Sequence, residues 1–189
     1  MRDATVPLLM AVFFASELAL ALVRRSRSAP GATRADRGSL RVLWIVITLS
    51  IMSAVALAGV PATRLPFSPA ALRGAAVVCL LGGIAFRWWA VITLGKFFTV
   101  DVATHADHAL VDTGPFRLVR HPSYTGLLLA FLGFGISLGH ASSLVVLMTP
   151  IAAAFAYRMR VEESALRKAL GPSYEAYCAR TKRLIPGVL

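Results

Sequence analysis

Residues 114–126 read Gly114-Pro-Phe-Arg-Leu-Val-Arg-His-Pro-Ser-Tyr-Thr-Gly126, and an apolar segment follows at once. Proline at position 122 suits the first turn of a helix, because the missing N–H would be unpaired there. The stretch therefore predicts a helix that enters a hydrophobic environment directly after the basic pair Arg120 and His121. The unpaired N–H groups and the positive end of the dipole of this helix would lie at the same place as the two basic side chains. That combination favours an anion-binding pocket where a membrane meets water.

The composition of the whole chain agrees with a membrane protein. Of its 189 residues, 57% are hydrophobic, and the mean hydropathy is +0.70. Soluble domains are about 45–50% apolar. The simplest organisation is one integral-membrane domain over residues 1–189, with N-terminal spans in 1–69 and a catalytic core in 70–189.

The hydropathy pattern predicts an all-α, polytopic protein with five transmembrane helices. The expected spans are Thr5–Val23, Val42–Val60, Ala70–Leu94, Pro122–Leu138 and Ala141–Tyr157. Arginines follow the first apolar run instead of preceding it, which favours an uncleaved helix over a signal peptide. Only two residues separate the last two spans, so we expect a tight helical hairpin. Its helices would approach each other closely at Gly126, Gly133 and Gly135.

Lys and Arg concentrate on one side of the expected spans, in residues 24–41, 95–121 and the tail from 158. The other side has only Arg2, Arg64 and Arg73. The positive-inside rule then places the N-terminus outside and the C-terminus in the cytoplasm, in the plasma membrane if the source is bacterial.

The remaining composition excludes several classes of function. The net charge is +11, but the basic residues form blocks between apolar spans without interleaved aromatic residues, which disfavours nucleic-acid binding. Cys79 and Cys178 lie far apart, and the four histidines lack the spacing of metal ligands. We therefore expect no metal and no disulfide framework.

A second polar cluster closes the last apolar segment. Arg158 and Glu162 are four residues apart and share a helix face, and Glu163 follows. A salt bridge within the helix is the plain explanation, and a cationic cofactor as partner of the acids is the functional one. Two further candidates have plain explanations. His108 is expected to be an exposed loop histidine, and Glu17 a bundle-facing acid of the first span, where acids are often functional.

Together these segments resemble the isoprenylcysteine carboxyl methyltransferase (ICMT) family of integral-membrane enzymes. The resemblance covers roughly residues 80–189. The matching residues are His108–Val111, Gly114–Phe116, Arg120–Tyr124, Gly126, Arg158, Glu162, Glu163, Gly171–Tyr174, Tyr177 and Leu184–Pro186.

The resemblance implies S-adenosylmethionine as methyl donor and a lipophilic acceptor such as a prenylcysteine-like carboxylate. Arg158 and Glu162 would be the catalytic pair, with Arg158 toward the acceptor. Phe116 stands where the family often has tyrosine, so a hydroxyl contact is lost there. The implied donor contacts are His108, Ala109, Leu110, Val111, Phe116, Arg120, His121, Pro122, Ser123, Tyr124 and Glu162.

The chemistry leaves alternatives open. Methyl transfer to a carboxylate needs alignment and exclusion of water, and no strong base. A lipid phenol or a phospholipid amine would need a base, such as His108, His121 or Glu162. A small thiol is another possible acceptor. Sterol-type reductases, which use NADPH, have a similar Arg-His-Pro segment. A non-catalytic membrane scaffold or lipid binder would explain the spans but not the two polar clusters.

Overall fold

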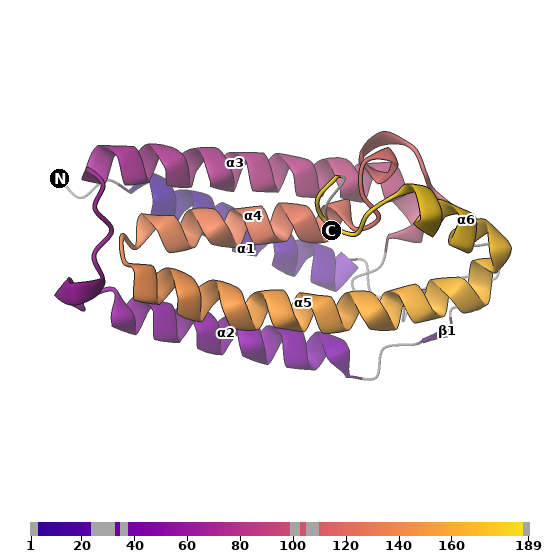
Figure 1. Cartoon of the computed structure of the whole chain (residues 1–189), viewed down its shortest axis with the longest axis horizontal. Coiled ribbons are helices and arrows are strands. Elements are labelled where there is room, and N and C mark those ends of the chain that lie inside the picture. The colour runs from indigo at the N-terminus through magenta and orange to yellow at the C-terminus, as the bar shows by residue number, and fades with distance from the viewer. Residues whose placement is uncertain (1–3, 24–32, 35–37, 99–102, 105–109, 187–189) are drawn as a thin grey trace.

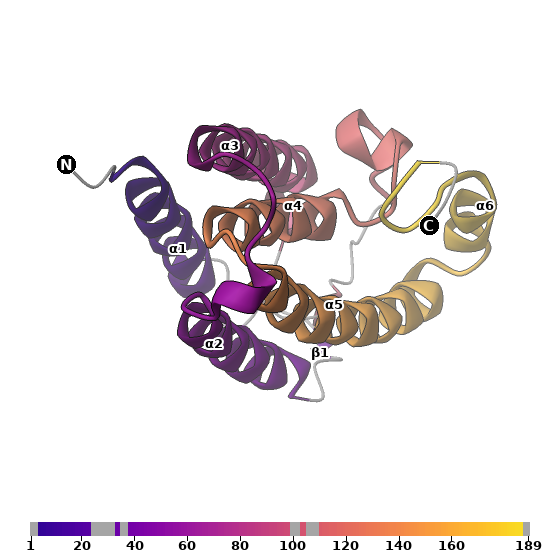
Figure 2. The same ribbon diagram turned by 60° about the vertical axis from the view of Figure 1, so that its left-hand side comes forward.

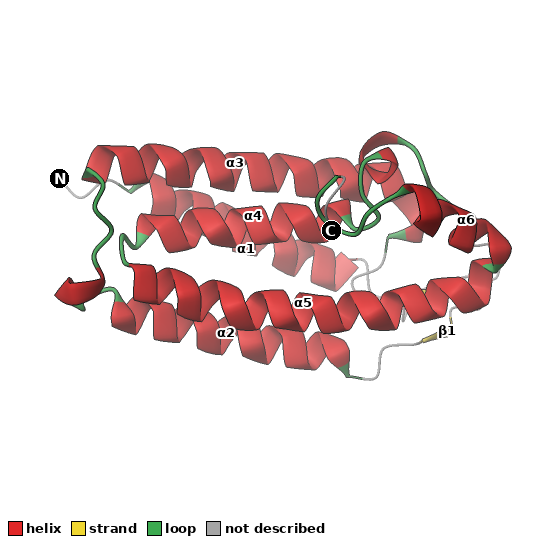
Figure 3. Ribbon diagram, viewed as in Figure 1, coloured by secondary structure: helices red, strands yellow, loops and turns green. Residues whose placement is uncertain are grey.

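A computed structural model describes residues 4–23, 33–34, 38–98, 103–104 and 110–186, and it is built almost entirely of helices (Figures 1 and 3). The short strands β1 (Thr33–Arg34) and β2 (Ala103–Thr104) pair antiparallel. Short 3-10 turns cover Pro61–Thr63, Gly95–Phe97 and Gly114–Arg117. The α-helices are α1 (Thr5–Val23), α2 (Ser39–Leu57), α3 (Pro69–Leu94), α4 (Pro122–Ser137), α5 (Ala141–Leu170) and α6 (Pro172–Arg180).

Four of the described helices, namely α1, α2, α3 and α5, are long and apolar enough to cross a membrane. The protein is thus an all-helical, polytopic membrane protein, as the hydropathy pattern predicts. Helix α4 is apolar but has 16 residues, about 24 Å at 1.5 Å per residue, against about 30 Å for a hydrocarbon core. A count of five crossing helices therefore stays a prediction.

The last long helix runs further than the expected fifth span. Helix α5 ends at Leu170 instead of Tyr157. Its 30 residues span about 45 Å, more than the hydrocarbon core. The polar end carries Arg158, Glu162 and Glu163 on the same continuous helix, so these residues are placed by a rigid element.

Close contact between α3 and α4 depends on glycine. A Cβ added to Gly83 would lie 2.6 Å from the Gly126 carbonyl oxygen, and one added to Gly126 would lie 2.6 Å from the Arg87 nitrogen. Gly133 faces α3 too, with the Ala76 carbonyl oxygen at 2.7 Å from its ideal Cβ. The expectation that these glycines serve the α4–α5 hairpin is wrong for Gly126 and Gly133. Spacing along one helix does not say which neighbour that helix packs against.

The remaining glycine of that prediction, Gly135, does face α5. The nearest atoms to its ideal Cβ belong to the side chains of Leu144 and Leu147. Helix α5 also packs along α2 (Figures 1 and 2), where the Ser143 hydroxyl donates to the Ala54 carbonyl oxygen at 2.7 Å. The hairpin itself is present, with residues 138–140 as the turn between the two helices.

Inside the bundle, Glu17 of α1 forms an ion pair with Arg87 of α3. Arg87 Nε and Nη2 lie 2.6 and 2.7 Å from the two carboxylate oxygens, and both side chains are mostly buried. Arg87 also donates from Nη1 to the Ser123 hydroxyl at the start of α4. The pair therefore ties α1 and α3 to the first turn of α4, and Glu17 faces the bundle as expected.

Candidate functional site

The predicted polar clusters meet at one end of the bundle, where the start of α4, the end of α5 and α6 come together (Figure 1). The C-terminal segment lies beside the start of α4. The Arg120 N–H donates to the Lys182 carbonyl at 2.7 Å, and the His121 N–H donates to the Arg183 carbonyl at 3.0 Å. The Thr125 hydroxyl donates to the Leu184 carbonyl at 2.9 Å. The C-terminal segment is thus a fixed wall of this site.

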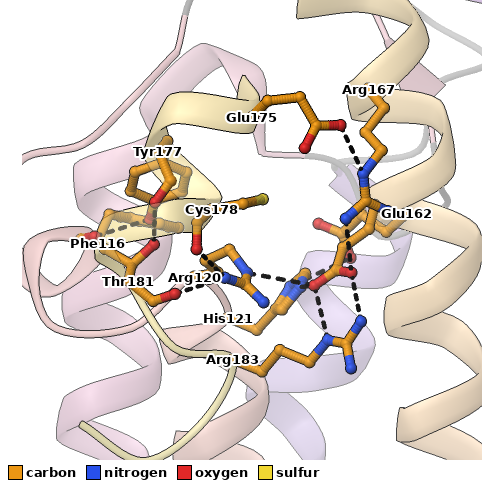
Figure 4. A network of polar contacts seen from close by, with 11 residues as sticks. Phe116, Arg120, His121, Glu162, Arg167, Glu175, Tyr177, Cys178, Thr181 and Arg183 are labelled. Atoms are coloured by element: carbon orange, nitrogen blue, oxygen red, sulfur yellow. Dashed lines mark hydrogen bonds and ion pairs between the residues drawn. The ribbon is translucent and has the colours of Figure 1, made fainter. Parts of the chain in front are cut away.

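Glu163 is the centre of an ion-pair network. It is fully buried, and Arg183 binds both of its oxygens at 2.9 and 2.8 Å. Arg120 Nε and His121 Nε2 lie 3.3 and 3.2 Å from Oε1. Arg167 approaches to 3.8 Å. In Figure 4 the side chains of Arg120, His121, Arg167 and Arg183 point toward one another. Because they come from three segments of the chain, Glu163 holds those segments together.

Arg120 is engaged with the protein itself. Besides Glu163, its Nη1 donates to the carbonyl oxygens of Cys178, at 2.9 Å, and Thr181. The guanidinium therefore anchors the end of α6 to the start of α4 (Figure 4). Its predicted contact with a methyl donor stays a prediction.

Tyr124 connects the two residues predicted to be catalytic. Its hydroxyl donates to Glu162 Oε2 at 2.8 Å and accepts from Arg158 Nε at 3.1 Å. Arg158 is buried and also donates from Nη1 to the Ser39 hydroxyl at 3.0 Å. The Glu162 side chain is 32% exposed, and its Oε2 lies 3.9 Å from His121 Nδ1. The result is a buried cation and a half-buried acid joined through one hydroxyl.

The other residues predicted to contact the donor differ in their burial, and two of them lie outside the described part of the chain. His108 and Ala109 lie outside the described residues, and Leu110 and Val111 are half-buried. Phe116 is buried, and its carbonyl oxygen accepts the Tyr177 hydroxyl at 2.7 Å. Burial raises the pKa of Tyr177 to about 12. Pro122 is buried at the first turn of α4, and the neighbouring Ser123 contacts Arg87.

Sequence reasoning missed the roles of Arg87 and Arg183. The signal for Arg87 was available, because an acid within a span needs a cation, and α3 carries one. Tyr174 was noted only as part of the resemblance. Its hydroxyl is buried without a hydrogen-bond partner among the described residues. Within the same residues, no group of three His, Cys, Asp or Glu side chains could hold a metal ion.

Comparison with known proteins shows what this part of the chain is similar to. Residues 76–168 match the model of the isoprenylcysteine carboxyl methyltransferase (ICMT) family. These residues are similar to that family, and we call them the ICMT segment. The family-matched residues include the start of α4 and the Arg158–Glu163 stretch of α5, so the ICMT segment supplies both sides of the candidate site.

Several curated proteins are similar to this chain. A probable protein-S-isoprenylcysteine O-methyltransferase of Oryza sativa subsp. indica is 32% identical over 112 residues, 58% of this chain and 59% of the relative. Protein-S-isoprenylcysteine O-methyltransferase B of Arabidopsis thaliana is 32% identical over 111 residues, 58% of this chain and 56% of the relative. The Schizosaccharomyces pombe enzyme is 34% identical over 111 residues, 58% and 46% of the two chains. This chain spans less than two thirds of each relative's length.

Proposed function

We propose that this protein transfers a methyl group from S-adenosylmethionine to the carboxylate of a lipophilic, prenylcysteine-like acceptor. One observation carries the proposal: Tyr124 of the ICMT segment joins Glu162, which is partly open, to Arg158, which is buried. An anion and a cation thus lie on either side of one hydroxyl, as a cationic donor and an anionic acceptor require. The names of the relatives support the same reaction.

The residues present fit such a donor. S-adenosylmethionine supplies an electrophilic methyl group on a positively charged sulfur when it is bound. Glu162 offers a partly exposed carboxylate to a positive charge or to a ribose hydroxyl. The buried Tyr174 hydroxyl, which has no hydrogen-bond partner among the described residues, is a further polar group at this end of the bundle. We place the rest of the donor against Leu110, Val111, Phe116 and the start of α4.

Arg158 suits the acceptor carboxylate. Guanidinium groups bind carboxylates with two parallel hydrogen bonds. Arg158 Nη1 donates to the neutral Ser39 hydroxyl, and a hydrogen bond from this nitrogen to a carboxylate would be charge-assisted and stronger. Tyr124 fixes Arg158 relative to Glu162, which aligns the acceptor with the donor. The acceptor is already anionic, so this chain needs no general base. The buried rings of Phe116 and Phe155 help to exclude water.

We also propose that this end of the bundle faces the cytoplasm. The proposal depends on the Lys and Arg distribution of the sequence and the positive-inside rule. Single cysteines at positions 64 and 117, in a chain without Cys79 and Cys178, should react with an impermeant reagent from opposite sides. Reaction from the same side would contradict this orientation.

Separate measurements of donor binding and turnover test the reaction. Glu162→Gln should weaken S-adenosylmethionine binding about 10- to 100-fold, because a charged contact is lost. Arg158→Ala should keep donor binding and slow methyl transfer to an S-farnesylated cysteine about 30- to 150-fold, equivalent to 2–3 kcal/mol in the barrier. The matched controls are Arg160→Ala and Glu175→Gln, which change exposed residues of the same charge.

Three results would contradict this assignment. Equal loss of donor affinity in both variants would place Arg158 in the donor site. Normal donor binding and normal turnover in the Arg158→Ala variant would mean that Arg158 has only a structural role. Binding of NADPH without binding of S-adenosylmethionine would favour a sterol-type reductase over a methyltransferase.

A further inference from the structure

A groove of about 750 Å³ lies at the end of the bundle opposite the candidate site. Its lining comes from the first turns of α1 and α3, the segment between α2 and α3, the last turn of α4 and the turn between α4 and α5. Those elements gather at the left of Figure 1, whereas α6 lies at the right. The volume falls within the roughly 300–1,000 Å³ range of small-molecule sites. The groove is therefore large enough for part of a lipid.

The lining combines cations with apolar walls. Arg64, Arg73 and His140 contribute basic side chains, and Leu72, Phe67 and Phe134 are among the apolar ones. None of the described residues that line the groove is acidic. Such a lining complements a molecule with an anionic head and an apolar tail.

The positive-inside rule gives no reason for these arginines. Lys and Arg gather at the other end of the spans, and the sequence places only Arg2, Arg64 and Arg73 on this side. Two of those three arginines line the same groove. Their shared position concentrates positive charge in this groove, on the side of the spans where Lys and Arg are otherwise rare.

The groove is held in shape by contacts between its walls. The Leu65 N–H donates to the Gly139 carbonyl oxygen at 2.9 Å, and Arg64 pairs with His140 in an isolated antiparallel bridge. The Thr63 and Ser142 hydroxyls lie 2.8 Å apart. His140 Nδ1 donates to the Leu138 carbonyl oxygen at 2.7 Å, which fixes the ring. Arg64 and His140 are thus brought together before any ligand binds.

From these contacts we propose that the groove binds a phospholipid with an anionic headgroup. The phosphate meets Arg64, Arg73 and His140, and an acyl chain lies along Phe67, Leu72 and Phe134. Free inorganic phosphate shares the headgroup chemistry but cannot use the apolar wall. Lipid binding at this groove is independent of methyl transfer at the other end of the bundle.

Native mass spectrometry of the delipidated full chain tests the proposal, with phosphatidylglycerol and phosphatidylcholine as probes. Phosphatidylglycerol should bind at one saturable site about 10- to 100-fold more tightly than phosphatidylcholine, which lacks a net negative charge. The double variant Arg64→Gln/Arg73→Gln should lose this preference. Arg117→Gln/Arg160→Gln, which removes the same charge at the other end, should keep it.

Competition with inorganic phosphate distinguishes the two sources of the anion. Millimolar phosphate should leave bound phosphatidylglycerol in place. Displacement by phosphate would reduce the groove to a simple anion site and overturn the lipid proposal. Equal binding of the two lipids, unchanged binding in the groove variant, or equal loss in the control would also overturn it.

A measurement on the unmodified protein covers the case in which the groove variant does not fold. Phosphatidylglycerol should raise its unfolding temperature more than phosphatidylcholine does, because a ligand that binds the native state stabilises it. Equal shifts with the two lipids would contradict the proposal without any substitution.

Discussion

Two adjacent glutamates of α5 have opposite surroundings. Glu163 is fully buried, and three arginines and one histidine lie within 4.0 Å of it. Glu162 is 32% exposed and accepts a hydrogen bond from Tyr124. Successive residues of a helix point about 100° apart, so one acid faces the C-terminal segment and the other faces the Tyr124–Arg158 pair. The comparison separates a carboxylate that builds the site from one that can meet a ligand.

The largest predicted effect comes from removing the charge of Glu163. Glu163→Gln would leave Arg120, Arg183 and His121 close together without their anion. Breaking a buried ion pair by removing one partner costs about 3–5 kcal/mol. We expect a large fall in the unfolding temperature of the detergent-solubilised protein, with loss of donor binding as a consequence.

Glu175→Gln is the control for this experiment. Its carboxylate pairs with Arg167 at 3.0 Å but is 59% exposed, so its loss should change stability by less than about 1 kcal/mol. Glu162→Gln should likewise unfold close to the wild-type temperature while it binds the donor poorly. A Glu163→Gln protein as stable as Glu175→Gln would show that the network does not hold the site together.

The Glu17–Arg87 pair is a second mostly buried ion pair, and it lies between two of the expected membrane spans. This pair has two charges, whereas the Glu163 network has several. Arg87→Met should destabilise by about 2–4 kcal/mol, because Glu17 is left buried without a counter-charge. The double variant Glu17→Gln/Arg87→Met should be more stable than Arg87→Met alone, because both charges are then gone.

Unfolding temperatures of the two single variants and the double variant give the coupling between these residues. Arg117→Met is the control, since Arg117 is exposed. Additive losses in the double variant would mean that Glu17 and Arg87 stabilise the bundle independently. That result would contradict the ion pair as the reason for an acid in the first span.

Hydropathy was sufficient to predict the membrane class and the approximate helices, because burial in lipid requires long apolar runs. It could not predict the end of α5 at Leu170, since a helix can continue into water with polar residues. It also misassigned the packing of Gly126 and Gly133, which face α3. Periodicity identifies a face of a helix and leaves its neighbour undefined.

The candidate site was predictable in part. The resemblance to ICMT enzymes brought Tyr124, Arg158 and Glu162 into one site, and the structure joins them by hydrogen bonds. The network around Glu163 depends on Arg183 and on the carbonyl oxygens that Arg120 binds, which are tertiary contacts between distant segments. No local sequence pattern encodes such contacts. The different surroundings of Glu162 and Glu163 could therefore be assigned only from the structure.

The smallest predicted effect concerns two arginines three residues apart near the C-terminal end. Arg183 binds both oxygens of the buried Glu163, and this contact raises the pKa of its guanidinium. Arg180 pairs with Asp112, where both side chains are about half exposed. Arg183→Ala should destabilise by about 1–2 kcal/mol, because a charge-assisted contact to a buried acid is lost. Arg180→Ala should change stability by less than about 0.5 kcal/mol.

Thermal unfolding at low and high salt separates these two arginines. Salt screens an exposed pair strongly and a partly buried one much less, and the Debye length at 1 M salt is about 3 Å. The Arg183 side chain is 40% exposed but its partner Glu163 is buried. The small effect of Arg180→Ala should therefore vanish at 1 M salt, while most of the effect of Arg183→Ala should persist. Equal and salt-sensitive losses would mean that Arg183 is as solvated as Arg180. The C-terminal segment would then be no fixed wall of the site, and Glu163 would depend on Arg120 and Arg167 for its charge balance.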